Sequence, residues 1–468
     1  MTRDLPIATP AVPDGACCAA CAAQQVVAPS TERPSATERP LAPVPTVSPM
    51  NGRPRVIRRD DDRRTTFAGL LVAAAFIGLA TLWIGLTSVR GGGTAWAALH
   101  ILLAGAAGTA IASVLPFFTS ALAQVPPADR RIRVAAIGLV AGGALAVTLG
   151  VSAGSLWLAT LGGLAYLAGI GLVAVAAFTP LRSRVGAGTG IVPIAYAVAL
   201  ANVAVGVAIA TAAVAGWAPV VTGWAQLKPA HAWLNVFGFV SLIVAATLVH
   251  LAPTVAGSRI RPRRSTIIAL VAMMAAPPLV AVGFIAASSA LAVVGAGLEV
   301  IGATALLTAT IGIRRDRGRW TSDREWHRFT GLSLLVAPAW FLVATVIAAA
   351  RIVSLGPTPE AWSIAVIGIP LAVGWIAQVL IGSWTHLVPA IGPGDQVAHA
   401  TQRARLGRWG TVRVVTWNGA VAAMTVGLLV DVGPLVIAGA VVVAVGVALA
   451  IGLLVLPGTT RHAGVQPV

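Results

Sequence analysis

The sequence predicts an all-α membrane protein with twelve transmembrane helices, cytoplasmic N and C termini, and three four-helix units in a pseudo-threefold arrangement. The composition, the placement of basic residues and an internal repeat predict it. Of the 468 residues, 57% are apolar and only 10% are charged, whereas about a quarter of the residues of a soluble domain are charged. This composition excludes a soluble enzyme, and three cysteines within five positions cannot staple a disulfide scaffold.

Stretches of about 20 apolar residues can cross roughly 30 Å of hydrocarbon as a helix. Twelve such stretches follow one another along the chain. They cover residues 67–88, 95–121, 133–153, 155–178, 190–215, 231–256, 266–287, 289–313, 329–353, 362–389, 413–431 and 434–456. We therefore expect a membrane domain over residues 66–457 and a short cytoplasmic tail over residues 458–468.

The basic residues lie in short segments between these stretches. Lys and Arg are enriched in the cytoplasmic loops of membrane proteins. With both termini in the cytoplasm, all 32 basic residues except Arg90, Lys228 and Arg351 fall on the cytoplasmic side. The net charge of +17 therefore reflects topology, and we expect no nucleic acid partner. The bilayer of the cell (plasma) membrane is the expected surrounding.

Residues 1–65 have a different composition, rich in Pro, Ala, Thr and Arg. Such a segment buries too little apolar surface to fold, so we expect a disordered cytoplasmic tail, and it lacks the apolar core of a signal peptide. The cluster Cys17, Cys18 and Cys21 offers soft thiolates to Cu(I) or Zn(II). The alternative is a reduced thiol cluster that binds no metal.

Two of the predicted spans repeat each other. Residues 238–253 (GFVSLIVAATLVHLAP) and 374–389 (GWIAQVLIGSWTHLVP) share the spacing of a glycine, an aromatic residue, a hydroxyl residue and His-Leu-x-Pro. A weaker relative in the second span starts at His100 and ends at residues 113–118 (SVLPFF). The offset of four spans makes the repeats parallel, since inverted repeats or two six-span halves would give offsets of three, five or six.

The start of the sixth span, residues 231–240 (HAWLNVFGFV), resembles the His-Ala-His-Leu-Asn motif of oxidase-like membrane proteins. Three parallel four-helix units are the plan of subunit I of the heme-copper oxidases and nitric oxide reductases. Residues 100–107 (HILLAGAA) and 374–382 (GWIAQVLIG) are similar to the membrane region of actinobacterial copper nitrite reductase or multicopper oxidase proteins. The resemblance covers most of residues 67–456. It implies heme or copper as cofactor and a copper nitrite reductase, multicopper oxidase or other respiratory redox partner.

The chain departs from that family at the copper site. The oxidases carry further copper-binding histidines on the seventh span and a His-x-His near the start of the tenth. Here the seventh span holds Met273, Met274, Pro277 and Pro278, and the start of the tenth has no histidine. We therefore expect no binuclear oxygen-reducing centre, and proton-pumping oxidase activity is not carried over.

Four of the seven histidines fall within predicted spans, where ionisable residues are costly and commonly functional. His100 and His231 are expected near the outer surface, and His250 and His386 near the inner surface. Neutral imidazole is a usual axial ligand of heme iron. We therefore predict two bis-His sites, His100 with His231 and His250 with His386, that pass electrons across the bilayer. By resemblance, His100 ligates heme b and His231 ligates heme or copper. The alternative is that these imidazoles only bond neighbouring helices.

Glu299 is the one carboxylate deep within a predicted span. Because an isolated charge is costly there, we expect it to be protonated or paired. It is a candidate proton relay or substrate-binding group, and the alternative is a neutral, helix-bonded side chain. Four amides are expected to bond across helices: Asn202, Asn235, Gln378 and Asn418. Three histidines in predicted loops or the tail are given no role: His327, His399 and His462.

The leading functional hypothesis is a heme-binding membrane redox protein of respiratory or nitrogen-oxide metabolism, an oxidoreductase component that exchanges electrons with a copper or heme partner. One alternative is a transporter or permease for copper or a small nitrogen-oxide species, with Glu299 and the histidines as transient ligands. Another is a membrane scaffold that keeps the oxidase fold without its chemistry. The missing copper-site histidines favour this last alternative.

Overall fold

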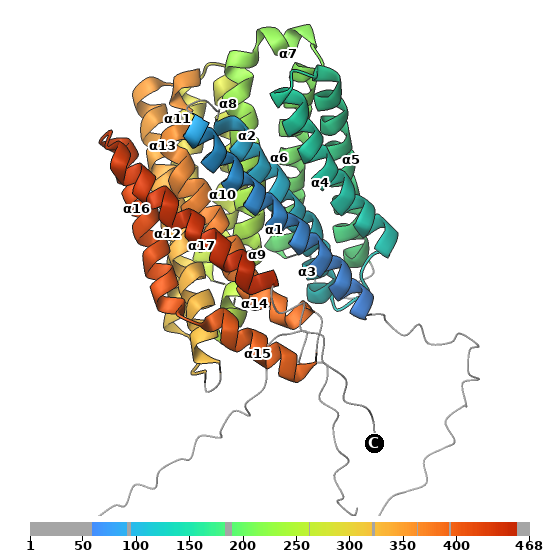
Figure 1. Cartoon of the computed structure of the whole chain (residues 1–468). Helices are drawn as coiled ribbons and strands as arrows, with labels where there is room; N and C mark the ends of the chain where they lie inside the picture. Colours follow the sequence, from blue (N-terminus) through green and yellow to red (C-terminus); the bar gives the residue numbers. More distant parts are fainter. Residues whose placement is uncertain are drawn as a thin grey trace, which may run out of the picture.

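The structure is a computed structural model that describes residues 59–90, 95–182, 190–261, 263–320, 323–362, 364–392 and 395–455. Within these ranges the chain is helical and has no strand (Figure 1). Twelve helical spans are long and apolar enough to cross a membrane, as the sequence predicts. The protein is therefore a multi-pass membrane protein. The cysteine cluster lies outside the described residues.

Nine of the spans in the described ranges are single helices, and three are composite. The single helices are α1 (Arg59–Arg90), α4 (Arg130–Ser152), α5 (Leu156–Arg182), α6 (Ile191–Val214), α10 (Arg264–Ile285), α11 (Ser289–Arg315), α12 (Arg324–Leu355), α16 (Gly410–Leu429) and α17 (Gly433–Val455). The composite spans are α2 (Ala95–His100), η2 (Ile101–Ala107) and α3 (Gly108–Ala123); α8 (Trp224–Asn235), η3 (Val236–Ser241) and α9 (Leu242–Ala256); and α13 (Ile364–Gly368), η5 (Ile369–Ala377) and α14 (Gln378–Ile391). Three short helices flank them: α7 (Ala218–Thr222), η4 (Pro359–Ala361) and α15 (Gln396–Gly407).

The composite spans are the second, sixth and tenth along the chain, and they form the interior of the bundle. In their most apolar windows, 67%, 83% and 81% of the residues are buried, against at most 56% in any other span. Each composite span contains a π-helical segment, and η2 contacts both η3 and η5. We call these three the inner spans. π-helical segments of this kind are rare and frequently lie at functional sites.

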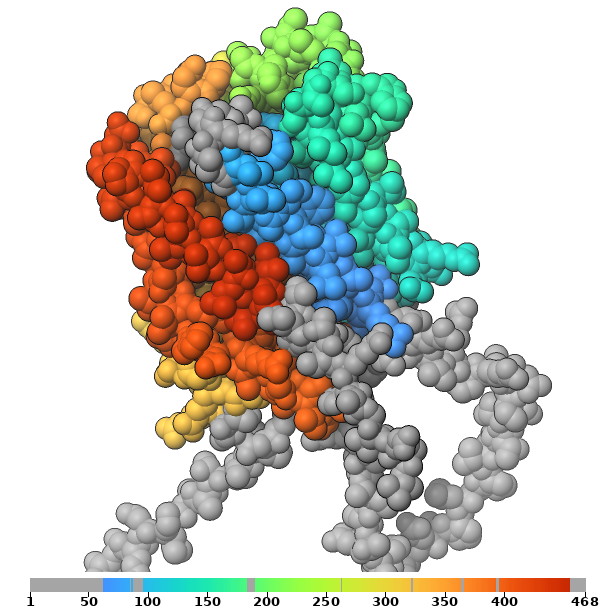
Figure 2. Space-filling view, in the orientation of Figure 1, coloured from blue at the N-terminus to red at the C-terminus, as the bar shows by residue number. Residues whose placement is uncertain are grey.

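The single helices surround the inner spans, and the first packs against the last. In Figure 2, α1 and α17 lie side by side on one face of the molecule, and they are in contact. The outward face of α17 is apolar, since Ile437, Val441 and Val445 are each more than half exposed. Apolar side chains exposed at helical spacing over the length of a span are suited to contact with lipid.

A turn with a glycine acceptor closes three hairpins at intervals of four spans, between α4 and α5, α10 and α11, and α16 and α17. Its central residue has a positive φ: 71° at Gly154, 48° at Ala287 and 55° at Asp431. The next residue donates its N–H to a glycine carbonyl five positions earlier: Ser155 to Gly150, Ser288 to Gly283, and Val432 to Gly427. We call the side of the bundle that holds these turns the turn face. The same backbone bonds also end α3, α6 and α9, where the acceptors are Ser120, Ala212 and Pro253. The recurring hairpin turn with the glycine acceptor follows the same four-span interval as the sequence repeat.

Glycine is required in the first two of these hairpins because the helices approach closely. A Cβ at Gly150 would lie 2.5 Å from the backbone nitrogen of Ala159, and one at Gly283 would lie 2.6 Å from that of Ala292. Small residues allow such backbone contact between membrane helices. The glycine content of the chain therefore serves tight packing within these hairpins.

Several helices begin earlier than their apolar stretches. Helix α1 begins at Arg59, within the segment predicted as a tail, while α8 begins at Trp224 and α12 at Arg324, before the predicted starts at residues 231 and 329. These extra turns contain polar and aromatic residues, which suit the membrane interface and lower the local hydropathy. A buried ion pair between Asp62 and Arg133 then joins the extended start of α1 to α4.

Candidate functional site

The predicted histidines lie near opposite ends of the inner spans. His100 ends α2 and His231 lies within α8, so both are close to the turn face. His250 lies near the end of α9 and His386 near the end of α14. His250 and His386 are close to the opposite side of the bundle. We call this side the arginine face, because the connection between α11 and α12 lies there and contains Arg317 and Arg319. His100 and His231 thus lie at one end of the inner spans, and His250 and His386 at the other.

His100 is held by its own helix. Its Nδ1–H donates to the carbonyl oxygen of Trp96 at 2.8 Å, and its ring lies 4.1 Å from the Trp96 ring, centroid to centroid. The imidazole retains some accessible surface. Since Nδ1 carries the proton in this arrangement, Nε2 has a free lone pair.

His231 is held by a neighbouring helix in the same manner. Its Nδ1–H donates to the carbonyl oxygen of Gly206 on α6 at 2.7 Å, and its ring retains some accessible surface. The Asn235 amide donates to the backbone carbonyl of His231 at 2.7 Å. Glycine is needed at position 206, because a Cβ there would lie 2.4 Å from Nδ2 of Asn235. His231 therefore also presents a lone pair on Nε2.

The two imidazoles come from inner spans that contact each other through η2 and η3. Metal-bound histidines commonly donate the second ring N–H to a backbone carbonyl, which fixes the tautomer and the ring orientation. Both His100 and His231 do so. The donor set fits a group that needs two imidazole nitrogens, as a b-type heme does. No group of three or more His, Cys, Asp or Glu side chains that could hold a metal ion is found among the described residues.

His250, one member of the predicted second bis-His site, is held differently from His100 and His231. The His250 side chain makes no hydrogen bond or ring contact with other described residues, and its Nδ1 is buried without a partner. Only its backbone carbonyl is engaged, by the Thr254 hydroxyl at 2.8 Å. His250 therefore lacks, among the described residues, the kind of positioning bond that holds His100 and His231.

His386 lies instead in an aromatic cluster with α12. Its buried ring stacks on Trp326, with centroids 4.9 Å apart and planes 13° apart. The ring of His327, which was given no role from sequence, lies 6.3 Å from that of His386 and stacks on Trp320 at 3.7 Å. Trp326 Nε1–H donates to the carbonyl oxygen of Thr385 at 2.7 Å. We call Trp320, Trp326, His327 and His386 the arginine-face cluster.

Glu299 lies far from either histidine group along the chain, near the middle of α11. Its side chain is fully buried, and neither carboxyl oxygen has a hydrogen-bond partner among the described residues. On the same face of α11, Gly295 is packed against Val280 and Gly302 against Met273 of α10. Glu299 therefore faces α10 near its two prolines, which leave carbonyl groups without an intrahelical N–H partner.

The predicted interhelical amide bonds are largely confirmed. Asn202 donates to the carbonyl of Gly238 at 3.0 Å, and Gln378 to that of Ser333 at 3.4 Å. Asn418 accepts from the indole N–H of Trp340 at 2.6 Å. The prediction for Asn235 is wrong, since its amide bonds to His231 of the same helix. This bond gives Asn235 a positioning role that its sequence context did not indicate.

No protein-family model and no curated protein matches this chain. We therefore infer the function from the geometry of the described residues.

Proposed function

We propose that the protein is a membrane redox protein that holds heme b between His100 and His231. The observation that carries this proposal is shared by both side chains: each gives its Nδ1–H to a backbone carbonyl and presents an unprotonated Nε2. The two rings lie at the same end of neighbouring inner spans. A copper ion, which the resemblance also allows, fits less well, because the described residues supply no third ligand of the usual types.

The architecture supports the resemblance to subunit I of the heme-copper oxidases. Spans two, six and ten are interior and carry π-helical segments. The recurring turn joins spans three and four, seven and eight, and eleven and twelve. Two independent features thus repeat every four spans. They favour three four-helix units in a pseudo-threefold arrangement. The placement of the basic residues favours both termini in the cytoplasm and the turn face outside.

A bound heme would supply a one-electron redox couple. The protein's contribution is to hold two neutral imidazoles with their rings fixed. For His100 this is done by Trp96 of the same helix, and for His231 by Gly206 and Asn235. A site near one face is suited to electron exchange with a partner there, such as a copper or heme protein of respiratory or nitrogen-oxide metabolism.

The test is a reduced-minus-oxidised optical spectrum of the detergent-purified protein, with heme and metal content per chain. We expect a b-type spectrum in the unsubstituted protein and in His399→Ala, because His399 lies on α15 and bonds Gly392 at the end of α14, at the opposite end of the inner spans from His100 and His231. His100→Ala and His231→Ala should lose the spectrum while remaining folded. A colourless protein from cells supplied with heme would refute the proposal.

Glu299 favours a second candidate function, transport of a proton or small cation. A fully buried carboxyl group with two unpartnered oxygens is typical of ion pathways in membrane proteins. Under this alternative, Glu299→Gln abolishes uptake into proteoliposomes while the optical spectrum is unchanged. Under the redox proposal, Glu299→Gln retains heme. Proteoliposomes with this variant then take up protons or cations no more slowly than those with the unsubstituted protein.

A further inference from the structure

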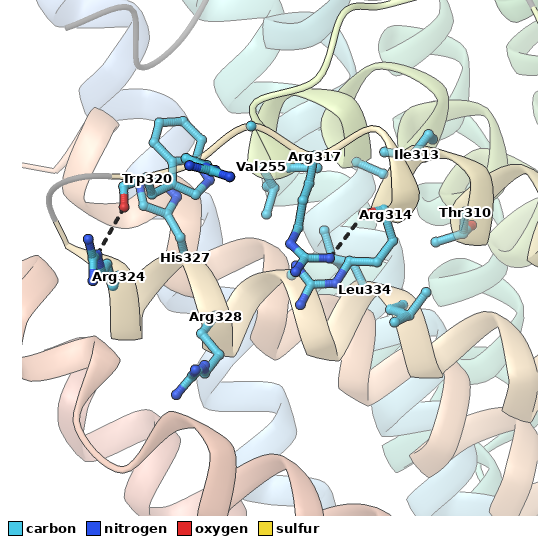
Figure 3. Close-up of a pocket in the computed structure, with 16 residues that line it drawn as sticks. Val255, Thr310, Ile313, Arg314, Arg317, Trp320, Arg324, His327, Arg328 and Leu334 are labelled. Carbon is cyan, nitrogen blue, oxygen red and sulfur yellow. Dashed lines mark hydrogen bonds between the residues drawn. The ribbon is translucent and has the colours of Figure 1, made fainter. Parts of the chain in front are cut away.

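A basic cavity opens at the arginine face, between the ends of α9 and α11 and the start of α12. Its volume is about 310 Å³, and Figure 3 shows the side chains that line it. Five of them are arginines: Arg314, Arg317, Arg319, Arg324 and Arg328. No lining residue is acidic. The cavity is separate from the heme site proposed above, which lies near the turn face.

Most arginines of this cavity have no carboxylate partner among the described residues, and two of them are held by backbone carbonyls. Arg317 donates to the backbone carbonyl of Arg314 at 3.4 Å, and Arg324 to that of Trp320 at 3.1 Å. Arg328 alone among the five pairs with a carboxylate in the described chain, the exposed Glu325 at 3.0 Å. The charge of Arg314 is within reach of those of Arg317 and Arg328. Figure 3 shows Arg314 and Arg317 beside each other above α12.

The two acidic residues of the described α11–α12 connection are directed to other arginines. Asp316 pairs with Arg263 at 2.7 Å, and Asp323 pairs with Arg403 at 2.7 Å. Neither Arg263 nor Arg403 lines the cavity. Asp316 and Asp323 are thus paired with arginines from outside the cavity, and Arg314, Arg317, Arg319 and Arg324 have no carboxylate partner among the described residues.

Residues 318–320 of the connection are also held in place beside the cavity. The N–H of Gly318 donates to the carbonyl of Ala256 at 3.0 Å. The Trp320 ring stacks on His327 with planes 4° apart and rests against Gly257. Gly257 has a φ of 61°, and a Cβ there would lie 2.9 Å from the Trp320 ring. A site that is already ordered loses less entropy when it binds a ligand.

Membrane topology explains why arginines occur at this face but not why they converge on a cavity. Arg130 and Arg131, which begin α4 at the same face, are exposed and line no part of it. Deeper in the cavity, Ile313 and Leu334 provide an apolar wall. The site thus combines clustered guanidinium groups with an apolar wall at the level of the membrane surface.

We propose that this cavity binds a phosphate group, carried either by an anionic lipid or by a soluble phosphomonoester. Guanidinium groups bind phosphate oxygens through paired, charge-assisted hydrogen bonds. Arg314 and Arg317 provide the central contacts, and Arg324 and Arg319 extend the positive surface toward the opening. The apolar wall accommodates the glycerol and upper acyl carbons when the phosphate belongs to a lipid.

The test compares two probes, phosphatidic acid in phosphatidylcholine nanodiscs and soluble glycerol 3-phosphate. Lipid retention is measured by native mass spectrometry, and soluble ligand binding by calorimetry. R314Q/R317Q should weaken binding of the preferred probe by about tenfold or more, because hydrogen bonds to charged groups are lost. The matched control R130Q/R131Q removes the same charge from the same face and should change binding by less than about twofold.

Gly331→Leu tests the location of the site without changing its charge. Gly331 lines the cavity, and a Cβ at this position meets no atom within 4 Å, so a leucine fills the cavity while the helix is retained. It should also weaken binding by about tenfold. Binding of phosphatidic acid alone identifies a lipid site, and binding of glycerol 3-phosphate identifies a soluble ligand. Absence of binding to both probes, retention of binding in Gly331→Leu, or equal loss in R130Q/R131Q would overturn the proposal.

Discussion

The histidines of the turn face and those of the arginine face lie at opposite ends of the helix bundle and differ in how they are held. His100 and His231 each donate Nδ1–H to a backbone carbonyl and retain accessible surface. His327 and His386 are buried, and each stacks on one tryptophan ring, Trp320 and Trp326 respectively. Hydrogen bonding from Nδ1 fixes the ring and leaves Nε2 for a ligand. The stacked imidazoles of His327 and His386 instead form part of the packing between helices.

A histidine within a membrane span can be held by a hydrogen bond from Nδ1 or by stacking on an aromatic ring. His250 and His386 align in the sequence repeat, yet His250 makes no side-chain contact of the kinds described and His386 packs on Trp326. The contacts of the imidazole ring, an Nδ1 hydrogen bond or an aromatic stack, differ between the two faces. The predictions below test that distinction, beginning with the largest expected difference.

Substitution of one histidine from each face should separate binding from packing. His231→Ala is expected to remove the bound heme while the protein remains folded. His386→Ala is expected to retain heme but to lower the free energy of unfolding by about 2–4 kcal/mol, because a buried ring is deleted. Heme per chain and the midpoint of unfolding in a denaturing detergent measure the two effects. Heme loss in His386→Ala with heme retained in His231→Ala would reverse the assignment.

Asn235 should affect heme retention through His231. Its amide bonds the His231 carbonyl and lies against Gly206, whose carbonyl accepts the His231 proton. Asn235→Leu is expected to weaken heme binding by about tenfold. Loss of a residue that positions a metal-binding histidine usually weakens binding by about 10- to 100-fold. The matched control is Asn418→Leu, which removes a buried amide bond to Trp340 far from the site. Titration of heme into the apoprotein measures both, and equal losses in the two variants would exclude a specific role for Asn235.

Much of the fold could be predicted because hydropathy, charge placement and the repeat each report on the whole chain. All twelve spans were found, and the repeat between residues 238–253 and 374–389 correctly singled out two inner spans. The starts of α8 and α12 could not be predicted, since their first turns contain polar and aromatic residues such as Lys228 and His327. Apolar content alone does not distinguish an interfacial helical turn from a loop.

The candidate site was only partly predictable for a related reason. The sequence shows which residue types lie near each face, so His100 and His231 could be placed together. It does not show which backbone carbonyl an imidazole reaches, and Gly206 on α6 gave no signal as the partner of His231. The arginine cavity was also hidden, because Arg314 and Arg317 satisfy the positive-inside rule whether or not their side chains converge.

The arginine-face cluster should depend on the Trp326 hydrogen bond to Thr385. Trp326→Phe keeps an aromatic ring beside His386 but leaves the Thr385 carbonyl without its indole donor. We expect a loss of about 1–2 kcal/mol in the free energy of unfolding, with no change in heme content. Trp409→Phe, at an exposed tryptophan, is the matched control and should be neutral. Heme loss in Trp326→Phe would indicate that the cluster belongs to a cofactor site.

The smallest effect is expected at the rim of the arginine cavity, where Glu325 pairs with Arg328 at 3.0 Å and both side chains are more than half exposed. Glu325→Gln should change the free energy of unfolding by less than about 0.5 kcal/mol, because exposed ion pairs contribute little. It also frees the charge of Arg328, so affinity for a phosphate probe should rise by no more than about threefold and should return to the original value at high salt. A rise that persists at high salt would place Arg328 among the buried ligand contacts, whereas a fall would show that Glu325 orients Arg328 toward the cavity.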